Sequence, residues 1–142
     1  MIFIYISVFC QNNNYIDLKT NDVWYGQDNV HIACKSTSTD IEILFIKLSM
    51  KNATTTNYTD VVTIESVQED NFRIVWGSKD LDKRANATGS NINPGILNFG
   101  IAAENVKYSD GGTYQCKISG LIAGNAVVYR AQGEVLIKSM YF

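Results

Sequence analysis

Apolar and polar residues alternate in short runs along most of the chain, and clusters of turn-forming residues separate these runs. No long segment shows the 3.6-residue period of an amphipathic helix, so the pattern predicts an all-β protein. About nine antiparallel strands are expected to form a two-sheet sandwich. The expected strands are 15–19 with a continuation at 23–25, 29–35, 41–49, 61–65, 72–76, one weak edge strand within 79–93, 96–101, 113–119 and 126–138.

The segment 41–49 is the most apolar of these expected strands. Because side chains alternate between the two faces of a sheet, Leu44, Ile46 and Leu48 are expected to face the core. The odd-numbered positions then lie on the outer face. Their apolar character indicates either an exposed interface, or a central strand that is apolar on both sides through β-propensity or is covered by long neighbouring side chains.

Length and composition are those of one folded domain. The chain has 142 residues, of which 46% are hydrophobic, and it shows no internal repeat or domain boundary. We therefore expect a single domain over 11–142. The net charge is −2 and the 12 basic residues are scattered, so the sequence offers no electrostatic footprint for nucleic acid.

The first ten residues, MIFIYISVFC, are almost wholly apolar and are followed by the polar run QNNN. This pattern predicts a signal peptide or its remnant over 1–10, with Val8 and Cys10 at the −3 and −1 positions, although the segment lacks a basic start. The alternative is a first strand. No later stretch approaches the length of apolar sequence that a membrane-spanning helix needs.

Three N-glycosylation sequons, each with a permitted middle residue, support a secretory route. Glycosylated chains are processed in the same oxidising compartments in which disulfides form, and Cys34 and Cys116 both lie in strand-like contexts. The sequence therefore predicts an extracellular glycoprotein, either secreted or part of the ectodomain of a membrane protein. The expected glycan sites are Asn52, Asn57 and Asn86.

The most specific local motif is the segment 108–116, which reads YSDGGTYQC. Every second residue from Asp110 gives Asp110, Gly112, Tyr114 and Cys116, which resembles the D-x-G-x-Y-x-C signature of the immunoglobulin superfamily. The resemblance covers about residues 14–139, and it implies a sandwich of the variable type, in which the tyrosine forms a corner at the entry to strand F.

The resemblance also implies a disulfide between Cys34 on strand B and Cys116 on strand F, 82 positions apart. This long separation leaves room for the extra strands C′ and C″ of a variable-type domain. Asp110 is expected to pair with an arginine, for which Arg84 has the better spacing and Arg73 is the alternative. One departure is plain: the tryptophan that the family buries on strand C is missing, so an aliphatic side chain of 41–49 must fill its place.

No residue pattern indicates catalysis. The sequence contains no nucleophile elbow, phosphate-cradling glycine loop or metal-binding cluster, and its cysteines lack C-x-x-C spacing. The lone histidine, His31, has no second ligand at a suitable spacing and is expected to face outward from its strand. We therefore expect no enzyme activity, no cofactor, no metal and no small-molecule substrate.

The family resemblance implies a role in recognition through the sheet formed by strands G, F, C and C′. The pattern is similar to membrane-distal domains of invertebrate (cnidarian) allorecognition receptors, which implies homophilic adhesion to another copy on an opposing cell. The alternatives are a virus-encoded immunoglobulin-like decoy that binds a host ligand and a structural spacer module. The candidate partner-binding residues are Ile41, Ile43, Phe45, Lys47, Thr113, Gln115, Lys117 and Tyr129.

Overall fold

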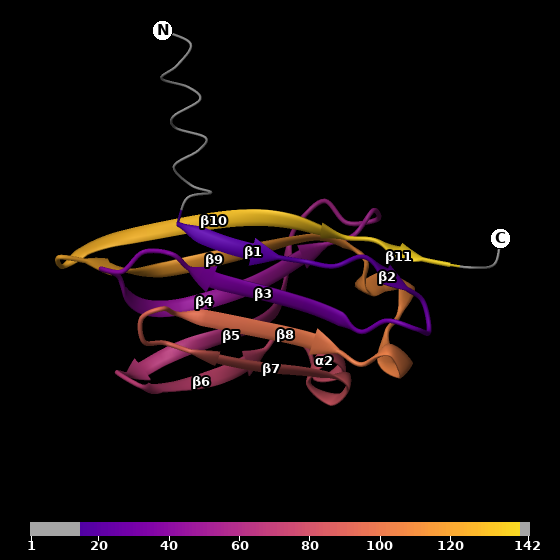
Figure 1. Ribbon diagram of the computed structural model, residues 1–142, viewed down its shortest axis with the longest axis horizontal. Coiled ribbons are helices and arrows are strands. Elements are labelled where there is room, and N and C mark those ends of the chain that lie inside the picture. Colours follow the sequence, from indigo (N-terminus) through magenta and orange to yellow (C-terminus); the bar gives the residue numbers. More distant parts are fainter. Residues whose placement is uncertain (1–14, 140–142) are drawn as a thin grey trace, which may run out of the picture.

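The computed structural model describes residues 15–139 and shows an all-β sandwich, elongated along its strands (Figure 1). Nine strands form two antiparallel sheets, which confirms the expected fold class. The four-stranded sheet has the order β1-β3-β8-β7. Its strands are β1 (Ile16–Lys19), β3 (Val30–Ser36), β8 (Ile96–Ile101) and β7 (Ala85–Ser90).

The five-stranded sheet has the order β10-β9-β4-β5-β6. It places β4 at the centre, between β9 and β5, so that both edges of β4 are hydrogen-bonded. β5 and β6 extend the sheet beyond β4. The strands are β10 (Asn125–Val135), β9 (Gly112–Ile122), β4 (Glu42–Lys51), β5 (Thr59–Gln68) and β6 (Asn71–Trp76).

A parallel pair of short strands joins the first part of the chain to its last part. β2 (Val23–Trp24) pairs with β11 (Ile137–Lys138), and the Val23 amide donates to the Leu136 carbonyl at 2.9 Å. The expected continuation at 23–25 is therefore a separate strand with its own partner, and the expected last strand 126–138 is interrupted at Leu136. The expected signal segment 1–10, with Cys10, lies outside the described residues.

The core lies between the two sheets and follows the period-two pattern of the strands. In β3, Val30, Ile32 and Cys34 are buried, while His31 and Lys35 are exposed. Burying such side chains contributes roughly 1.5–3 kcal/mol each, which is the main source of stability for a sandwich of this size. The Cys34–Cys116 disulfide joins β3 of one sheet to β9 of the other.

One helix interrupts the polar section where only a weak edge strand was expected. Helix α2 (Lys79–Arg84) precedes β7, and the Ser78 hydroxyl caps it by accepting from the Leu81 amide at 3.2 Å. The acidic residues Asp80 and Asp82 stand in its first turn, where the helix dipole favours negative charge. No helix within 15–139 is long and apolar enough to cross a membrane.

Candidate functional site

The outer face of the five-stranded sheet carries a row of three cationic side chains. The register places Lys117 of β9 directly opposite Lys47 of β4 on one side and Arg130 of β10 on the other. Like charges directly opposite one another across strands are destabilising, so this row favours binding of an anionic group. Lys47 is partly neutralised by Asp60, at 3.6 Å between Nζ and Oδ2.

Phe45 lies next to this row, on the same face of β4, and is only half-buried. The Lys47 and Lys117 ammonium groups lie 5.7 Å and 5.8 Å from the centre of its ring. A cation within about 6 Å of an aromatic face is attracted by the ring quadrupole, by about 0.5–1 kcal/mol at exposed sites. These two contacts hold both lysine side chains against the ring and create an aromatic centre with a cationic rim.

Two other predicted residues of β9 share this face. Thr113 and Gln115 alternate with the buried Tyr114 and Cys116, so their side chains are half-buried on the outside with that of Lys117. The structure therefore brings together five of the eight predicted partner-binding residues. They are Phe45, Lys47, Thr113, Gln115 and Lys117.

The predictions that Ile41 and Ile43 lie on this outer face were wrong. Both side chains are buried, with exposures of 6% and 2%, while Leu44 is 43% exposed instead of facing the core. The cause is a β-bulge: the pairing of β4 with β9 shifts between Ile43 and Phe45, so Leu44 is an extra residue without a partner. The expected alternation holds only from Phe45 onward.

The prediction for Tyr129 was also wrong. The register places Tyr129 opposite the buried Ile118, so its side chain points to the inner side of the sheet. There it packs against the core and stacks on Tyr15, with ring centres 4.4 Å apart. Strand β10 is eleven residues long, and its phase is set by Ala131 opposite Cys116.

Asp110 is the centre of a buried network below this sheet. Arg84 donates two hydrogen bonds of 2.7 Å to its two carboxylate oxygens, and the Lys107 amide donates a third, also of 2.7 Å. The Tyr114 hydroxyl donates to the Asp110 carbonyl at 2.5 Å, which is the tyrosine-corner contact. Arg84, and not Arg73, therefore contacts Asp110, while Arg73 pairs with Glu65 at 2.8 Å on the surface.

Hydrogen bonds and burial shift the pKa values of Arg84, Tyr114 and Asp80 in and beside this network. The hydrogen bonds to Asp110 raise the pKa of Arg84 above its usual range. Burial raises the pKa of Tyr114 above its usual range. The hydrogen bonds from Arg84 and Lys107 lower the pKa of Asp80, which lies 2.8 Å and 3.1 Å from them. All these groups keep their ordinary charge at neutral pH, as a structural network requires.

Leu48 occupies the position next to the disulfide on β4. It pairs with Cys116 in the register and is 1% exposed, so it is one of the aliphatic side chains that fill the place of the missing tryptophan. Phe99 supplies aromatic volume nearby, with ring centres 6.4 Å from Trp76 and 6.5 Å from Tyr114. The disulfide, the tyrosine corner and the two sheets together make an immunoglobulin-like sandwich.

The comparisons with known proteins add no closer assignment. No model of a known protein family and no curated protein matches this chain. Its function is therefore inferred from its own residues.

The three sequons lie away from the cationic row. Asn52 and Asn57 are in the connection between β4 and β5, and Asn86 is exposed on β7, at the edge of the other sheet. At Asn52 the side-chain Oδ1 accepts from the Thr54 hydroxyl at 2.7 Å.

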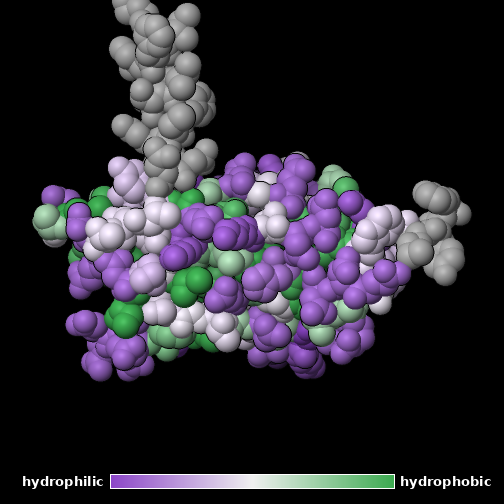
Figure 2. Space-filling model, in the orientation of Figure 1, coloured by the Kyte–Doolittle hydropathy of each residue, from purple (hydrophilic) through white to green (hydrophobic). Residues whose placement is uncertain are grey.

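Figure 2 shows a mostly hydrophilic side of the molecule, on which the hydrophobic areas are small and separate.

Sequence reasoning missed one further group of exposed apolar residues. Leu44, Val67 and Ile92 are 43%, 60% and 39% exposed, and all three line a single cleft at one end of the sandwich. They come from three separate segments, so no periodicity within one strand indicates them. The bulge at Leu44 could not be predicted either, because the sequence around it is typical of an uninterrupted strand.

Proposed function

We propose that this chain is an extracellular recognition domain of the variable-type immunoglobulin class. It binds a protein partner through the outer face of the five-stranded sheet, and the partner is a second copy on an opposing cell, as in allorecognition receptors. The observation that carries the proposal is Phe45 held between Lys47 and Lys117. Aromatic residues with a polar and charged rim are typical of protein interfaces.

The charges of the face are compatible with self-association. Besides the cationic row, the same face carries Glu65, which is directly opposite Phe45, and Glu134, which is opposite Thr113. In a two-fold arrangement each contact occurs twice, so cations of one copy can meet carboxylates of the other. The three expected glycan sites lie outside the cationic row. Asn52 adjoins Gly112 and Thr113 at the start of β9, so glycans leave the row itself and the remainder of β9 accessible.

A second candidate function is supported by the row itself. Arg130, Lys117 and Lys47 stand side by side across three strands, which gives a strip of one sign on one part of the face. Such a strip steers an acidic partner and suppresses basic ones. This favours a heterophilic receptor or a decoy that captures an acidic ligand. The experiment below distinguishes this alternative from homophilic binding. Neither proposal assigns the chain catalytic activity, a metal or a cofactor.

The test displays the chain on two differently coloured populations of cells that do not otherwise adhere. Homophilic binding predicts mixed clusters of the two populations, and it predicts that Phe45→Asp abolishes them. Tyr108→Asp is the matched control, because Tyr108 is an exposed aromatic in the turn before β9, where it stacks on Tyr25. Equal surface display of both variants, measured with an antibody against a tag, excludes loss of folding.

The outcomes separate the two functions. Clusters that persist with Phe45→Asp would contradict the assignment of the face. Absence of clusters at high display would contradict homophilic binding and leave the heterophilic alternative, which predicts that soluble chain stains cells carrying an acidic ligand and that Lys117→Glu abolishes this staining.

A further inference from the structure

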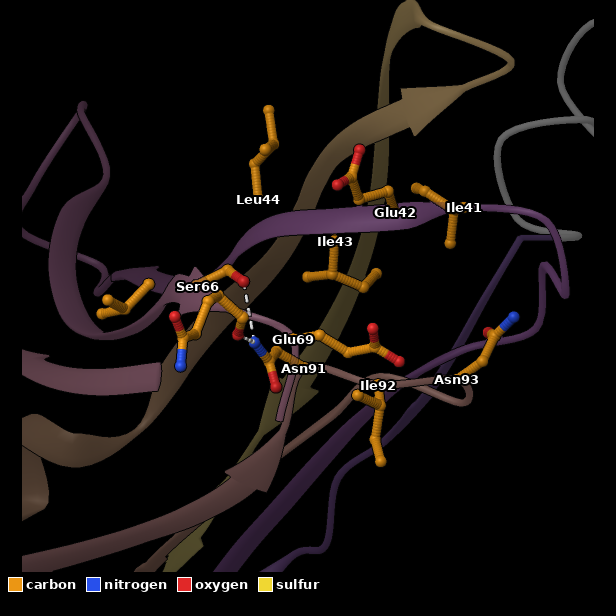
Figure 3. Close-up of a pocket in the computed structure, with 11 residues that line it drawn as sticks. Ile41, Glu42, Ile43, Leu44, Ser66, Glu69, Asn91, Ile92 and Asn93 are labelled. Atoms are coloured by element: carbon orange, nitrogen blue, oxygen red, sulfur yellow. Dashed lines mark hydrogen bonds between the residues drawn. The ribbon is translucent and has the colours of Figure 1, made fainter. Parts of the chain in front are cut away.

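A cleft of about 380 Å³ opens at the end of the sandwich where β4 begins (Figure 3). Its walls come from the first residues of β4, from the turn between β5 and β6, and from the loop between β7 and β8. The cleft lies at strand ends and does not include Phe45, Lys47 or Lys117. An inference about it therefore does not depend on the function proposed above.

The walls of the cleft combine apolar and polar side chains. Ile41 and Ile43 are buried beneath it, and Val67 and Ile92 are exposed beside it. Figure 3 shows Glu69 extending between Ile43 and Ile92. A pocket of this size, at the lower end of the range for ligand sites, accommodates one extended side chain.

The charged groups that line the cleft are all acidic. They are Glu42 and Glu69, and within residues 15–139 neither carboxylate forms an ion pair or a side-chain hydrogen bond. No lysine or arginine lines the cleft. A negatively charged site that also has apolar side chains in its walls is complementary to a cation that carries an apolar stem, and repels an acidic ligand.

Asn91 adds an unsatisfied acceptor to the same set of lining residues. Its Nδ2 group donates to the carbonyl oxygens of Gln68 and Asn71, at 2.8 Å and 3.1 Å, and to the Ser66 hydroxyl at 2.7 Å. Carbonyl oxygens can only accept, so these bonds fix the orientation of the amide. The Oδ1 atom is then buried without a hydrogen-bond partner among the described residues. Because Oδ1 is buried, the acceptors that a ligand can reach are the two carboxylates, which give the lining a surplus of negative charge.

The same hydrogen bonds position Glu69. Gln68 and Asn71 flank the two-residue turn that carries Glu69, and Asn91 ties this turn to the loop between β7 and β8. The two walls of the cleft are thus held at a fixed separation in the free protein. Such preorganisation reduces the entropy lost when a ligand binds.

From these observations we infer that the cleft binds the side chain of an arginine presented by a partner protein. The aliphatic stem packs on the exposed Ile92, above the buried Ile43, and the guanidinium group pairs with Glu69. Arginine fits better than lysine because its planar guanidinium presents several donors in a fork that matches a carboxylate and is more weakly hydrated.

The test is an NMR titration of the isotopically labelled full chain with N-acetyl-arginine-N-methylamide. Saturable shifts are expected at residues 41–44, 66–69 and 91–93. The citrulline analogue is the matched ligand control, because it has nearly the same shape without the charge. Its affinity is expected to be lower by about three- to tenfold, and Glu69→Gln is expected to lower arginine affinity by a similar factor.

A control variant shows whether the effect is specific to the cleft. Glu104→Gln changes an exposed carboxylate in the connection between β8 and β9, and it is expected to leave the titration unchanged. Equal affinity for citrulline, an unchanged titration with Glu69→Gln, or shifts spread equally over carboxylates elsewhere would overturn the inference.

Discussion

Among the ion pairs within residues 15–139, Arg84–Asp110 is the most buried, with side-chain exposures of 13% and 6%. Removing one partner of a buried pair leaves the other charge without compensation, which costs more than the pair contributes. Arg73–Glu65 has the same chemistry on the surface, with exposures of 70% and 38%. The two arginines therefore allow a direct comparison of burial.

We expect Arg84→Ala to lower the free energy of unfolding by about 3–5 kcal/mol. The matched variant Arg73→Ala is expected to change it by about 1 kcal/mol or less, because water screens the exposed pair. Urea denaturation followed by tryptophan fluorescence measures both values. Similar losses for the two variants would show that the Asp110 network does not carry the stability assigned to it.

Tyr114 provides a pH-dependent test of the same network. Tyr114→Phe removes the hydrogen bond to the Asp110 carbonyl and is expected to cost about 0.5–1.5 kcal/mol at pH 7. Because burial raises the folded-state pKa of Tyr114, the neutral phenol stabilises the fold fully below the unfolded-state pKa of about 10, and this contribution is lost as the pH rises above it. The deficit of the variant should therefore narrow between pH 7 and pH 10.5 in urea titrations; an unchanged deficit would contradict the raised pKa.

Most residues of this network could be predicted because an aspartate, a tyrosine and a cysteine at fixed spacing form a motif. The family resemblance implied an arginine partner for Asp110, and spacing favoured Arg84 over the alternative Arg73 without excluding it. The direction of Tyr129 could not be predicted in the same way. It depends on which residue of β9 lies opposite Tyr129. The sequence of β10 does not alternate clearly between apolar and polar residues, so it does not show which of its side chains face the core.

At the scale of elements, β4 shows how one residue changes the assignment of a strand. Its sequence from Ile41 to Leu48 is apolar at nearly every position, so alternation could be read in either phase. Before the bulge at Leu44 the odd-numbered residues of this segment face the core, and after it the even-numbered residues do. The position of the strand could be predicted from the sequence, but the side-chain directions only for its second part.

Deleting Leu44 tests this description of β4. Because Leu44 is the unpaired extra residue, its deletion leaves Ile43 facing inward and Phe45 facing outward, and we expect the free energy of unfolding to change by about 1 kcal/mol or less. Deleting Lys47 instead reverses the phase between Ile46 and Leu48 and should cost several times more. Thermal and urea unfolding compare the two; equal losses would contradict the bulge.

Helix α2 was missed although the sequence contains its signals. Ser78 is a favoured N-cap residue, Asp80 and Asp82 suit the first turn, and Lys83 and Arg84 suit the last turn. The helix has only six residues and none of them is buried. It therefore lacks the apolar period that identifies longer helices. The capping residue and the charges at its two ends are the only helix signals that its sequence carries.

At the scale of the whole molecule, the two sheets expose different outer faces. The four-stranded sheet presents Lys35 on β3, and the five-stranded sheet presents Lys47 on β4. Our central claim is that only the second face binds the partner. The sequence provides an unusual opportunity to test this claim, because each lysine stands two positions before a serine or threonine, namely Thr37 and Ser49.

The most direct measurement is therefore the clustering of displaying cells after a glycan is placed on either face. Lys47→Asn creates a sequon with Ser49 on the five-stranded sheet, and Lys35→Asn creates one with Thr37 on the four-stranded sheet. Both substitutions remove one positive charge, and glycan occupancy is checked by the shift in electrophoretic mobility. We predict that Lys47→Asn abolishes clustering and that Lys35→Asn preserves it. Clustering that survives a glycan at position 47, or is lost with one at position 35, would contradict the assignment of the binding face.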